Sequence, residues 1–93
     1  MEYTLFYPTP WNEVDEGNDN IDVCLTFHDG RSFTFVVATP DNLKWLMAKD
    51  AVSYVTPGAP FLIVEKLTPE IISQLIAQIV KDEALLRTYG SNL

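Results

Sequence analysis

Residues 21–38 read IDVCLTFHDGRSFTFVVA, and this stretch decides the fold. On both sides of residues 28–30, apolar side chains alternate with polar ones, which is the pattern of two half-buried strands. A two-residue Asp-Gly turn would put the two apolar sets on opposite faces of the hairpin. A three-residue turn over residues 28–30 pairs Leu25 with Phe33, so that both sets share one face. We therefore predict this turn, with Gly30 in the left-handed conformation.

The segments that flank this hairpin predict another strand and a first helix. Residues 3–7 read YTLFY and predict a short strand that ends at the prolines that follow. The run Thr39-Pro-Asp41 combines a capping hydroxyl, a proline at the first helical position and an acid in the first turn. It predicts a helix that ends near Asp50. The side chains expected to be buried on this helix are Leu43, Leu46 and Met47.

The second half of the chain predicts another hairpin and a second helix. Residues 52–55 and 61–64 are short apolar runs, and the Pro57-Gly58 pair between them suits a tight turn. Because residues 61–64 are apolar on both faces, we expect that strand in the centre of the sheet. Thr68-Pro-Glu70 repeats the helix start. The apolar stripe of this helix is Ile72, Leu75, Ile76, Ile79 and Val80, with Ser73, Gln74 and Lys81 outside.

Together these elements predict one α+β domain over residues 1–93. The order β-β-β-α-β-β-α gives a mostly antiparallel sheet of about five strands, with two helices packed on one face. The other face would carry small and partly polar side chains, namely Cys24, Thr26, Ser32, Thr34 and Val36. That face could meet water or another chain.

The negative charge of the chain gathers in one segment. The 93 residues carry 13 acids and 6 Lys or Arg, for a net charge of −7. Five acids without a base stand within residues 13–22: Glu13, Asp15, Glu16, Asp19 and Asp22. Glycine and asparagines between them are typical of a loop, and we expect a flexible acidic loop over residues 13–20. The charge argues against direct binding to nucleic acid or to anionic membranes.

The residue types that catalysis or metal binding needs are few. The chain has one cysteine and one histidine, Cys24 and His28. On one strand they would lie about 13 Å apart, beyond the ~3 Å reach of a nucleophile and its base. One cysteine cannot form a zinc site of several cysteines, and one histidine cannot form a site of several histidines. The acidic segment lacks the glycine and the glutamate that a calcium-binding loop requires at fixed positions. We therefore expect no enzyme activity, no cofactor and no metal.

Features that the sequence lacks indicate the cellular compartment. No segment resembles a signal peptide, and no apolar run approaches the ~20 residues of a membrane span. The single cysteine cannot form an intramolecular disulfide, as is typical of proteins in a reducing environment. We expect a cytoplasmic protein.

Three motifs resemble those of a family of small bacterial α+β proteins. They are DVCLTFHDGRSFTF at residues 22–35, TPDNL at residues 39–43 and FLIVEKLTPEII at residues 61–72. The resemblance covers most of residues 21–80, although this chain has a shorter connection between the first helix and the second hairpin. The motifs contain no catalytic residue and the family has no assigned activity. The resemblance therefore implies the fold and no particular chemistry.

The charge pattern favours a non-catalytic protein–protein interaction module that binds a basic partner. Small acidic proteins of this size include immunity proteins and other inhibitors, and a regulatory module has the same profile. The segregated charge would steer a cationic partner, and two tryptophans could anchor the contact or pack in the core. The expected contact residues are Trp11, Glu13, Asp15, Glu16, Asp19 and Trp45. The alternative is a homodimerising domain whose free sheet face or strand edge closes on itself, and a small enzyme is least favoured.

Overall fold

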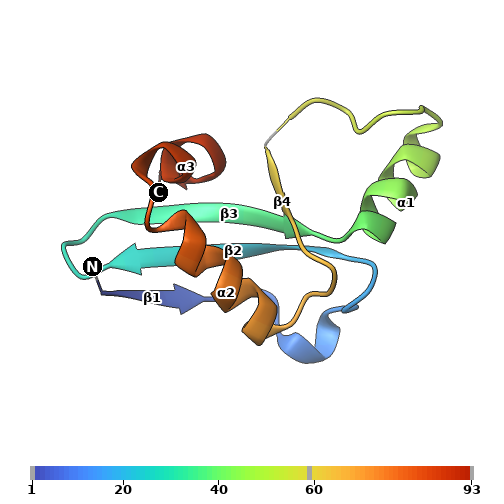
Figure 1. Cartoon of the computed structure of the whole chain (residues 1–93). Coiled ribbons are helices and arrows are strands. Elements are labelled where there is room, and N and C mark those ends of the chain that lie inside the picture. The colour runs from blue at the N-terminus through green and yellow to red at the C-terminus, as the bar shows by residue number, and fades with distance from the viewer. Residues whose placement is uncertain (1, 59, 93) are drawn as a thin grey trace.

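The sheet lies at the centre of the molecule, and its strands have the order β1-β2-β3-β4 (Figure 1). The computed structural model describes residues 2–58 and 60–92. The strands are β1 (Tyr3–Phe6), β2 (Asn20–Phe27), β3 (Ser32–Ala38) and β4 (Phe61–Ile63), and a two-residue β5 (Ser91–Asn92) pairs with the beginning of β3. Neighbours are antiparallel except β3 and β4, which are parallel. The sheet is therefore mixed and mostly antiparallel, and the predicted α+β class is confirmed.

The central hairpin has the predicted turn and register. Leu25 lies opposite Phe33, and the N–H of Phe27 donates to the carbonyl of Arg31 at 2.9 Å, which closes a three-residue turn. Gly30 has a φ of +98°, a conformation that costs glycine little because it has no Cβ. The alternation of apolar and polar residues in the two strands therefore predicted the correct turn.

The described residues also form three α-helices and one 3₁₀ turn. They are η1 (Trp11–Glu13), α1 (Pro40–Asp50), α2 (Pro69–Ile79) and α3 (Glu83–Tyr89). The side chains of Thr39 and Thr68 accept backbone N–H bonds at the starts of α1 and α2, so both predicted caps are confirmed. Asp82 caps α3 in the same way and separates it from α2.

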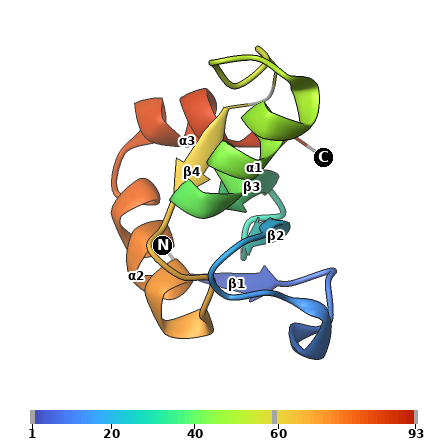
Figure 2. The same ribbon diagram turned by 90° about the vertical axis from the view of Figure 1, so that its right-hand side faces the viewer.

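Helices α2 and α3 cover one face of the sheet (Figures 1 and 2). The core between them and the sheet is apolar and includes Val23, Leu25, Phe35, Val37, Ile72, Ile76 and Leu86. On α2, Ser73 and Gln74 are exposed as predicted, whereas Leu75 is half-buried at the margin of the stripe. Burial of this apolar area is the main favourable term in folding.

The predicted second hairpin is wrong. Residues 52–58 contain no strand, and β4 pairs with β3 in parallel, with Val36 opposite Phe61. This places β4 at an edge of the sheet, not in its centre. A parallel pair needs a crossover of about a dozen residues or more, and α1 with the loop after it supplies that length. Residues 61–63 therefore pair with the edge of β3 at residues 36–38, and not with residues 52–55.

The expected packing of the first helix is also wrong. Helix α1 projects from the end of the sheet and does not cover a face (Figure 1). Leu43, Leu46 and Met47 are only half-buried, and none of them packs against the core. Its one buried side chain is that of Asn42. The break at Asp82 creates α3, and α2 and α3 together occupy the face that α1 was expected to share.

None of the described α-helices covers the other face of the sheet, which we call the outer face (Figure 2). The predicted small residues of β2 and β3 on this face are half-buried or exposed. The outer face is more apolar than the sequence indicated, because β1 contributes Phe6 and β4 contributes Phe61 and Ile63. Phe6 is 65% exposed and Ile63 is 46% exposed. Asp22 is the only charged residue that strands β1 to β4 place on this face.

Candidate functional site

The acidic segment folds on its own carboxylates. The Asp15 carboxylate accepts hydrogen bonds from the N–H groups of Gly17 and Asn18, at 3.1 and 3.2 Å. The Asp19 carboxylate accepts from the N–H of Asp15 at 3.2 Å and from that of Asn20 at 2.8 Å. Short aspartate side chains often form such local turns in place of regular structure. The order of residue types within the segment therefore specifies its shape.

Backbone groups then join this loop to the rest of the fold. The N–H of Leu67 donates to the carbonyl of Glu16 at 2.8 Å. The hydroxyl of Thr39 donates to the carbonyl of Gly17 at 2.9 Å, and the N–H of Thr39 donates to the carbonyl of Asp19 at 3.3 Å. Thr39 thus caps α1 and holds the loop with the same side chain. These hydrogen bonds do not favour the predicted flexibility of the loop over residues 13–20. The mobility of the loop stays a prediction that hydrogen exchange can test.

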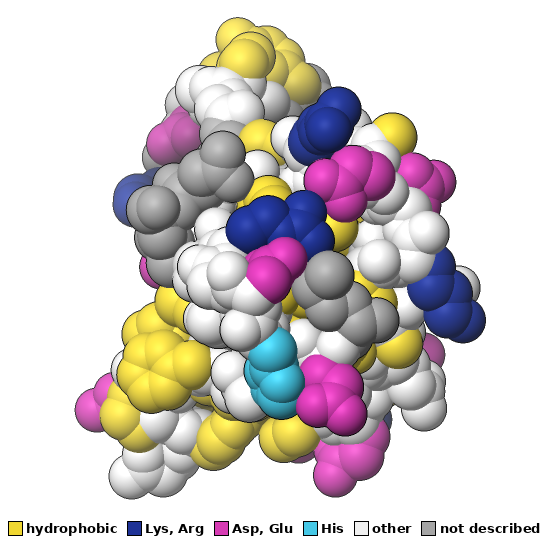
Figure 3. Space-filling model, turned by 90° about the vertical axis from the view of Figure 1, so that its left-hand side faces the viewer, with side chains coloured by type: hydrophobic (Ala, Val, Ile, Leu, Met, Phe, Trp, Pro, Cys, Tyr) yellow, Lys and Arg dark blue, Asp and Glu magenta, His cyan; other side chains and the backbone are white. Residues whose placement is uncertain are grey.

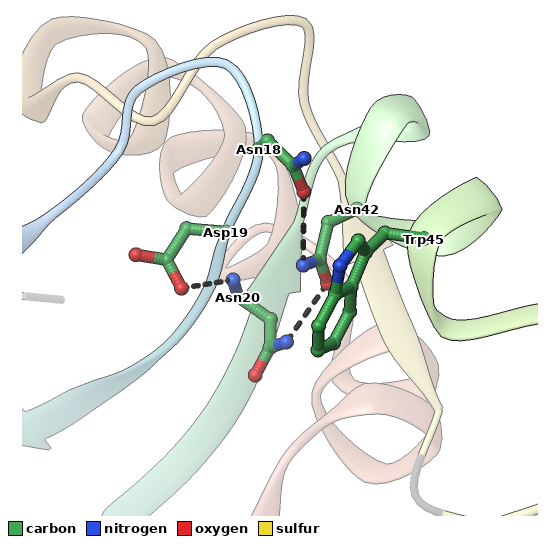
Figure 4. A pocket seen from close by; sticks show the side chains of 5 residues that line it. All are labelled: Asn18, Asp19, Asn20, Asn42 and Trp45. Carbon is green, nitrogen blue, oxygen red and sulfur yellow. Dashed lines mark hydrogen bonds between the residues drawn. The ribbon is translucent and has the colours of Figure 1, made fainter. Parts of the chain in front are cut away.

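Asn42 connects the loop to α1 from a buried position. It is 5% exposed. Its Nδ2 donates to Asn18 Oδ1 at 3.3 Å, and its Oδ1 accepts from Asn20 Nδ2 at 2.8 Å (Figure 4). A primary amide suits this position because it carries both donors and an acceptor. Buried polar groups are stable only when they are bonded in this way.

A hollow of about 270 Å³ lies where the loop meets α1, and we call it the loop-end hollow. Its lining residues are Asn18, Asp19, Asn20, Asn42 and Trp45. In Figure 4, Asn18 and Asn20 point toward Asn42, whereas the Asp19 carboxylate points away from Trp45. Trp45 is 50% exposed, and Lys49 Nζ lies 5.4 Å from the centroid of its ring. The hollow combines an aromatic ring with three amide side chains. None of its lining residues is a histidine, a cysteine or a residue with a hydroxyl group.

The structure brings together only some of the expected contact residues. Asp19 and Trp45 both line the loop-end hollow, and Asp15 is bonded to Asp19 beside it. Glu13 lies in η1 and Glu16 on the loop, both exposed. Trp11 is half-buried, packs against the core, and its ring centroid lies 4.9 Å from that of Tyr7. We therefore leave Trp11 outside the candidate site.

The sequence analysis did not predict the three asparagines of the hollow as site residues. Asn18 and Asn20 resemble ordinary loop residues, and Asn42 resembles an ordinary polar helix residue. A signal was present in the Thr-x-x-Asn pattern at residues 39–42, which is one of the motifs that the family resemblance rests on. In the structure, the threonine and the asparagine of this pattern both hold the acidic loop.

The two ends of the sheet differ in how their acids are balanced. At the hairpin end, seen in Figure 3, Glu2 lies 3.2 Å from His28, and Arg31 pairs with both Asp29 and Glu83. The backbone N–H of Arg31 and its charge lower the pKa of Asp29. At the other end, no ion pair between described residues includes an acid of the segment 13–22. The negative charge of that segment is therefore not compensated by a cationic side chain of the described residues.

Several other properties bear on the choice of function. Within residues 2–58 and 60–92, no three His, Cys, Asp or Glu side chains gather in a way that could hold a metal ion. The described helices are all too short or too polar to cross a membrane. No family model, no curated protein and no solved structure matches this chain. A functional proposal therefore rests on the geometry and charge of the molecule itself.

Proposed function

We propose that the protein is a non-catalytic interaction module that binds a basic protein partner at its loop end, in the manner of an immunity protein, an inhibitor or a regulator. One observation carries this proposal. An exposed tryptophan, Trp45, shares a hollow with Asp19, beside a segment whose acids have no ion-pair partner among the described residues.

Each part of this surface has a role in recognising a protein. Tryptophan is enriched among the residues that carry most of the binding energy at interfaces. Uncompensated charge accelerates encounter with a partner of opposite sign and acts mainly on the association rate. The hydrogen bonds of Asp15 and Asp19 preorganise the loop, which lowers the entropy that binding must remove.

The test is a kinetic one, on a partner first recovered by a salt-sensitive pull-down. The double variant Glu13→Gln/Glu16→Gln removes two charges whose side chains accept no hydrogen bond from another described residue. Its association should be roughly 3–10 times slower at low salt, with little change in dissociation. At 1 M salt the difference should disappear, because the Debye length falls to about 3 Å.

The control variant is Glu2→Gln/Glu83→Gln, which makes the same change in net charge at the hairpin end. It should associate at nearly the wild-type rate. Equal slowing by both double variants would show that only net charge matters, and equal rates for all three proteins would end the steering proposal.

A second candidate function is self-association through the outer face, which the exposure of Phe6 and Ile63 favours. Two copies with a net charge of −7 each would meet with least repulsion at a face whose strands carry one acid, Asp22. A two-fold axis would pair this face with itself. Light scattering after size exclusion separates the candidates: a dimer that Phe6→Ser converts to a monomer would support self-association, and a monomer at all concentrations would reject it.

A further inference from the structure

We propose that the free edge of strand β1 pairs with the same edge of a second copy of this chain, antiparallel and across a two-fold axis. The two sheets would then continue into one. This interface does not involve the basic partner, and it is a different surface from the outer face. The inference therefore goes beyond the proposed function and is tested separately from it.

Strand β1 lies at the margin of the sheet, with one side paired to β2 and the other side open (Figure 1). The N–H of His28 donates to the carbonyl of Glu2 at 3.2 Å, which marks these two residues as a hydrogen-bonded pair. Such pairs alternate with non-bonded pairs along an antiparallel ladder, so Thr4 bonds to β2 whereas Tyr3 and Leu5 do not. The N–H and carbonyl groups of Tyr3 and Leu5 therefore point to the open side, and no described residue bonds to them there.

Tyr7 continues this open edge by one residue pair. It comes directly before Pro8, and a residue before proline is restricted to extended conformations. By the same alternation its backbone groups lie on the open side, and none of them bonds to a described residue. The open edge thus presents the backbone donors and acceptors of Tyr3, Leu5 and Tyr7.

Charge favours a second copy as the occupant of this edge. Residues 3–12 contain no acid and no base, in a chain whose net charge is −7. Two copies repel one another least where neither carries charge, whereas a basic partner gains no attraction at such an edge. Many natural sheets protect an exposed edge with charged side chains, prolines or bulges. Residues 3–7 contain no charge and no proline, so this edge is open to pairing.

The residue types define the register. A two-fold axis at Leu5 pairs Leu5 with its own copy and Tyr3 with Tyr7, so that all the outward backbone groups of both strands are bonded. On the outer face, Thr4 then lies opposite Phe6 of the second copy. The two Phe6 rings become diagonal neighbours at about 7–8 Å, within reach of aromatic side chains. Phe6 is 65% exposed in the single chain, and this pairing would cover part of it. An axis at Thr4 would leave Tyr7 unpaired.

The interface is short, so we expect a weak dimer. Contacts with less buried area than a standard interface are typical of transient complexes. We expect a Kd of about 0.1 mM, which leaves about 60% of the chains monomeric at about 50 µM protein and about 20% at about 1 mM. Sedimentation equilibrium of the full chain over this range measures the association.

Hydrogen exchange measured by NMR at the same two concentrations identifies the surface that pairs. The N–H of Leu5 should exchange about threefold more slowly at the higher concentration, because only the remaining monomer leaves it open to water. The control is the N–H of Tyr54, an exposed loop residue whose N–H has no partner among the described residues. Its exchange rate should not depend on concentration.

Two variants of one residue separate the backbone from the side chain. Leu5→Pro removes an N–H that bonds to no described residue in the single chain, and edge strands tolerate proline. It should weaken dimerisation at least about tenfold, whereas Leu5→Ala keeps the N–H and should stay within about threefold of wild type. Equal dimerisation of the two variants, each shown to be folded by circular dichroism, would refute the pairing. If Leu5→Pro does not fold, the exchange rates of the wild type still decide.

Added salt distinguishes this inference from the proposed function. It should strengthen the dimer, because it screens the repulsion between two copies of charge −7, whereas it slows association with a basic partner. A monomer at all concentrations overturns the inference. So does a dimer in which the exchange of Leu5 is independent of concentration, and Phe6→Ser then tests the outer face. Neither result changes the kinetics of the Glu13→Gln/Glu16→Gln variant, which decide the proposed function.

Discussion

Helices α1 and α2 begin with the same device and end in different surroundings. Thr39 and Thr68 both cap a helix whose first residue is a proline. Helix α2 then buries three isoleucines in the core, whereas α1 buries only Asn42, which bonds to the acidic loop. A cap thus determines where a helix begins, and the side chains of its inner face determine what it packs against. Helix α2 is therefore held by apolar packing, whereas the buried contact of α1 is polar.

The largest effect should come from removing a side chain of the α2 region. Ile76 is fully buried, so Ile76→Ala should lower the free energy of unfolding by about 2–5 kcal/mol, through lost burial and a new cavity. Urea denaturation measures this value. Gln74→Ala, on the exposed face of the same helix, is the control and should stay within about 0.5 kcal/mol of wild type. Similar values for both would refute the assignment of the faces.

Removing the polar link of the α1 region should have an intermediate effect. Asn42→Ala takes away two hydrogen bonds and should cost about 1–2 kcal/mol, because Asn18 and Asn20 can recover part of the loss by bonding to water. Native-state hydrogen exchange should show faster exchange at the amides of Thr39 and Leu67, which bond to the loop.

The matched control for this variant is Asn12→Ala, because Asn12 is an exposed asparagine of η1. It should leave stability and exchange unchanged. Unaltered exchange in Asn42→Ala would show that the backbone anchors hold the loop without this side chain.

A smaller effect is expected from the apolar side chains of α1. Leu46 is half-buried and does not pack against the core, so Leu46→Ala should cost less than about 1 kcal/mol. The midpoint of thermal unfolding is sufficient to compare it with Ile76→Ala. A loss above about 2 kcal/mol would mean that α1 is held by an apolar contact comparable to that of α2.

The smallest effect should come from the acids themselves. Glu13→Gln/Glu16→Gln should leave the unfolding midpoint unchanged or raise it slightly, since like charges are removed from an unpaired segment. Glu2→Gln/Glu83→Gln should lower it slightly, because those acids have partners in His28 and Arg31. Denaturation of both variants in low salt measures the difference. A reversal of the two signs would contradict the contrast between the ends of the sheet.

Sequence reasoning was most accurate where the cause is local. The turn at residues 28–30, the register of β2 and β3 and the caps at Thr39 and Thr68 all depend on residues close together in the chain. It failed at residues 52–64, where the pattern fitted a hairpin and the strand instead joined the distant edge of β3. Apolar runs of three or four residues indicate burial but do not name a partner.

The sequence by itself determined the central hairpin, the starts of the helices and the concentration of acids in one segment, because alternation, caps and charge act over a few residues. The tertiary structure alone decided which face α2 and α3 cover, where β4 pairs and what lies beside Trp45. The loop-end hollow combines residues 18–20 with residues 42 and 45, which the whole of the hairpin separates. Because β3 runs antiparallel to β2, the end of β3 lies beside the start of β2. This arrangement brings the acidic loop, which precedes β2, next to α1, which follows β3.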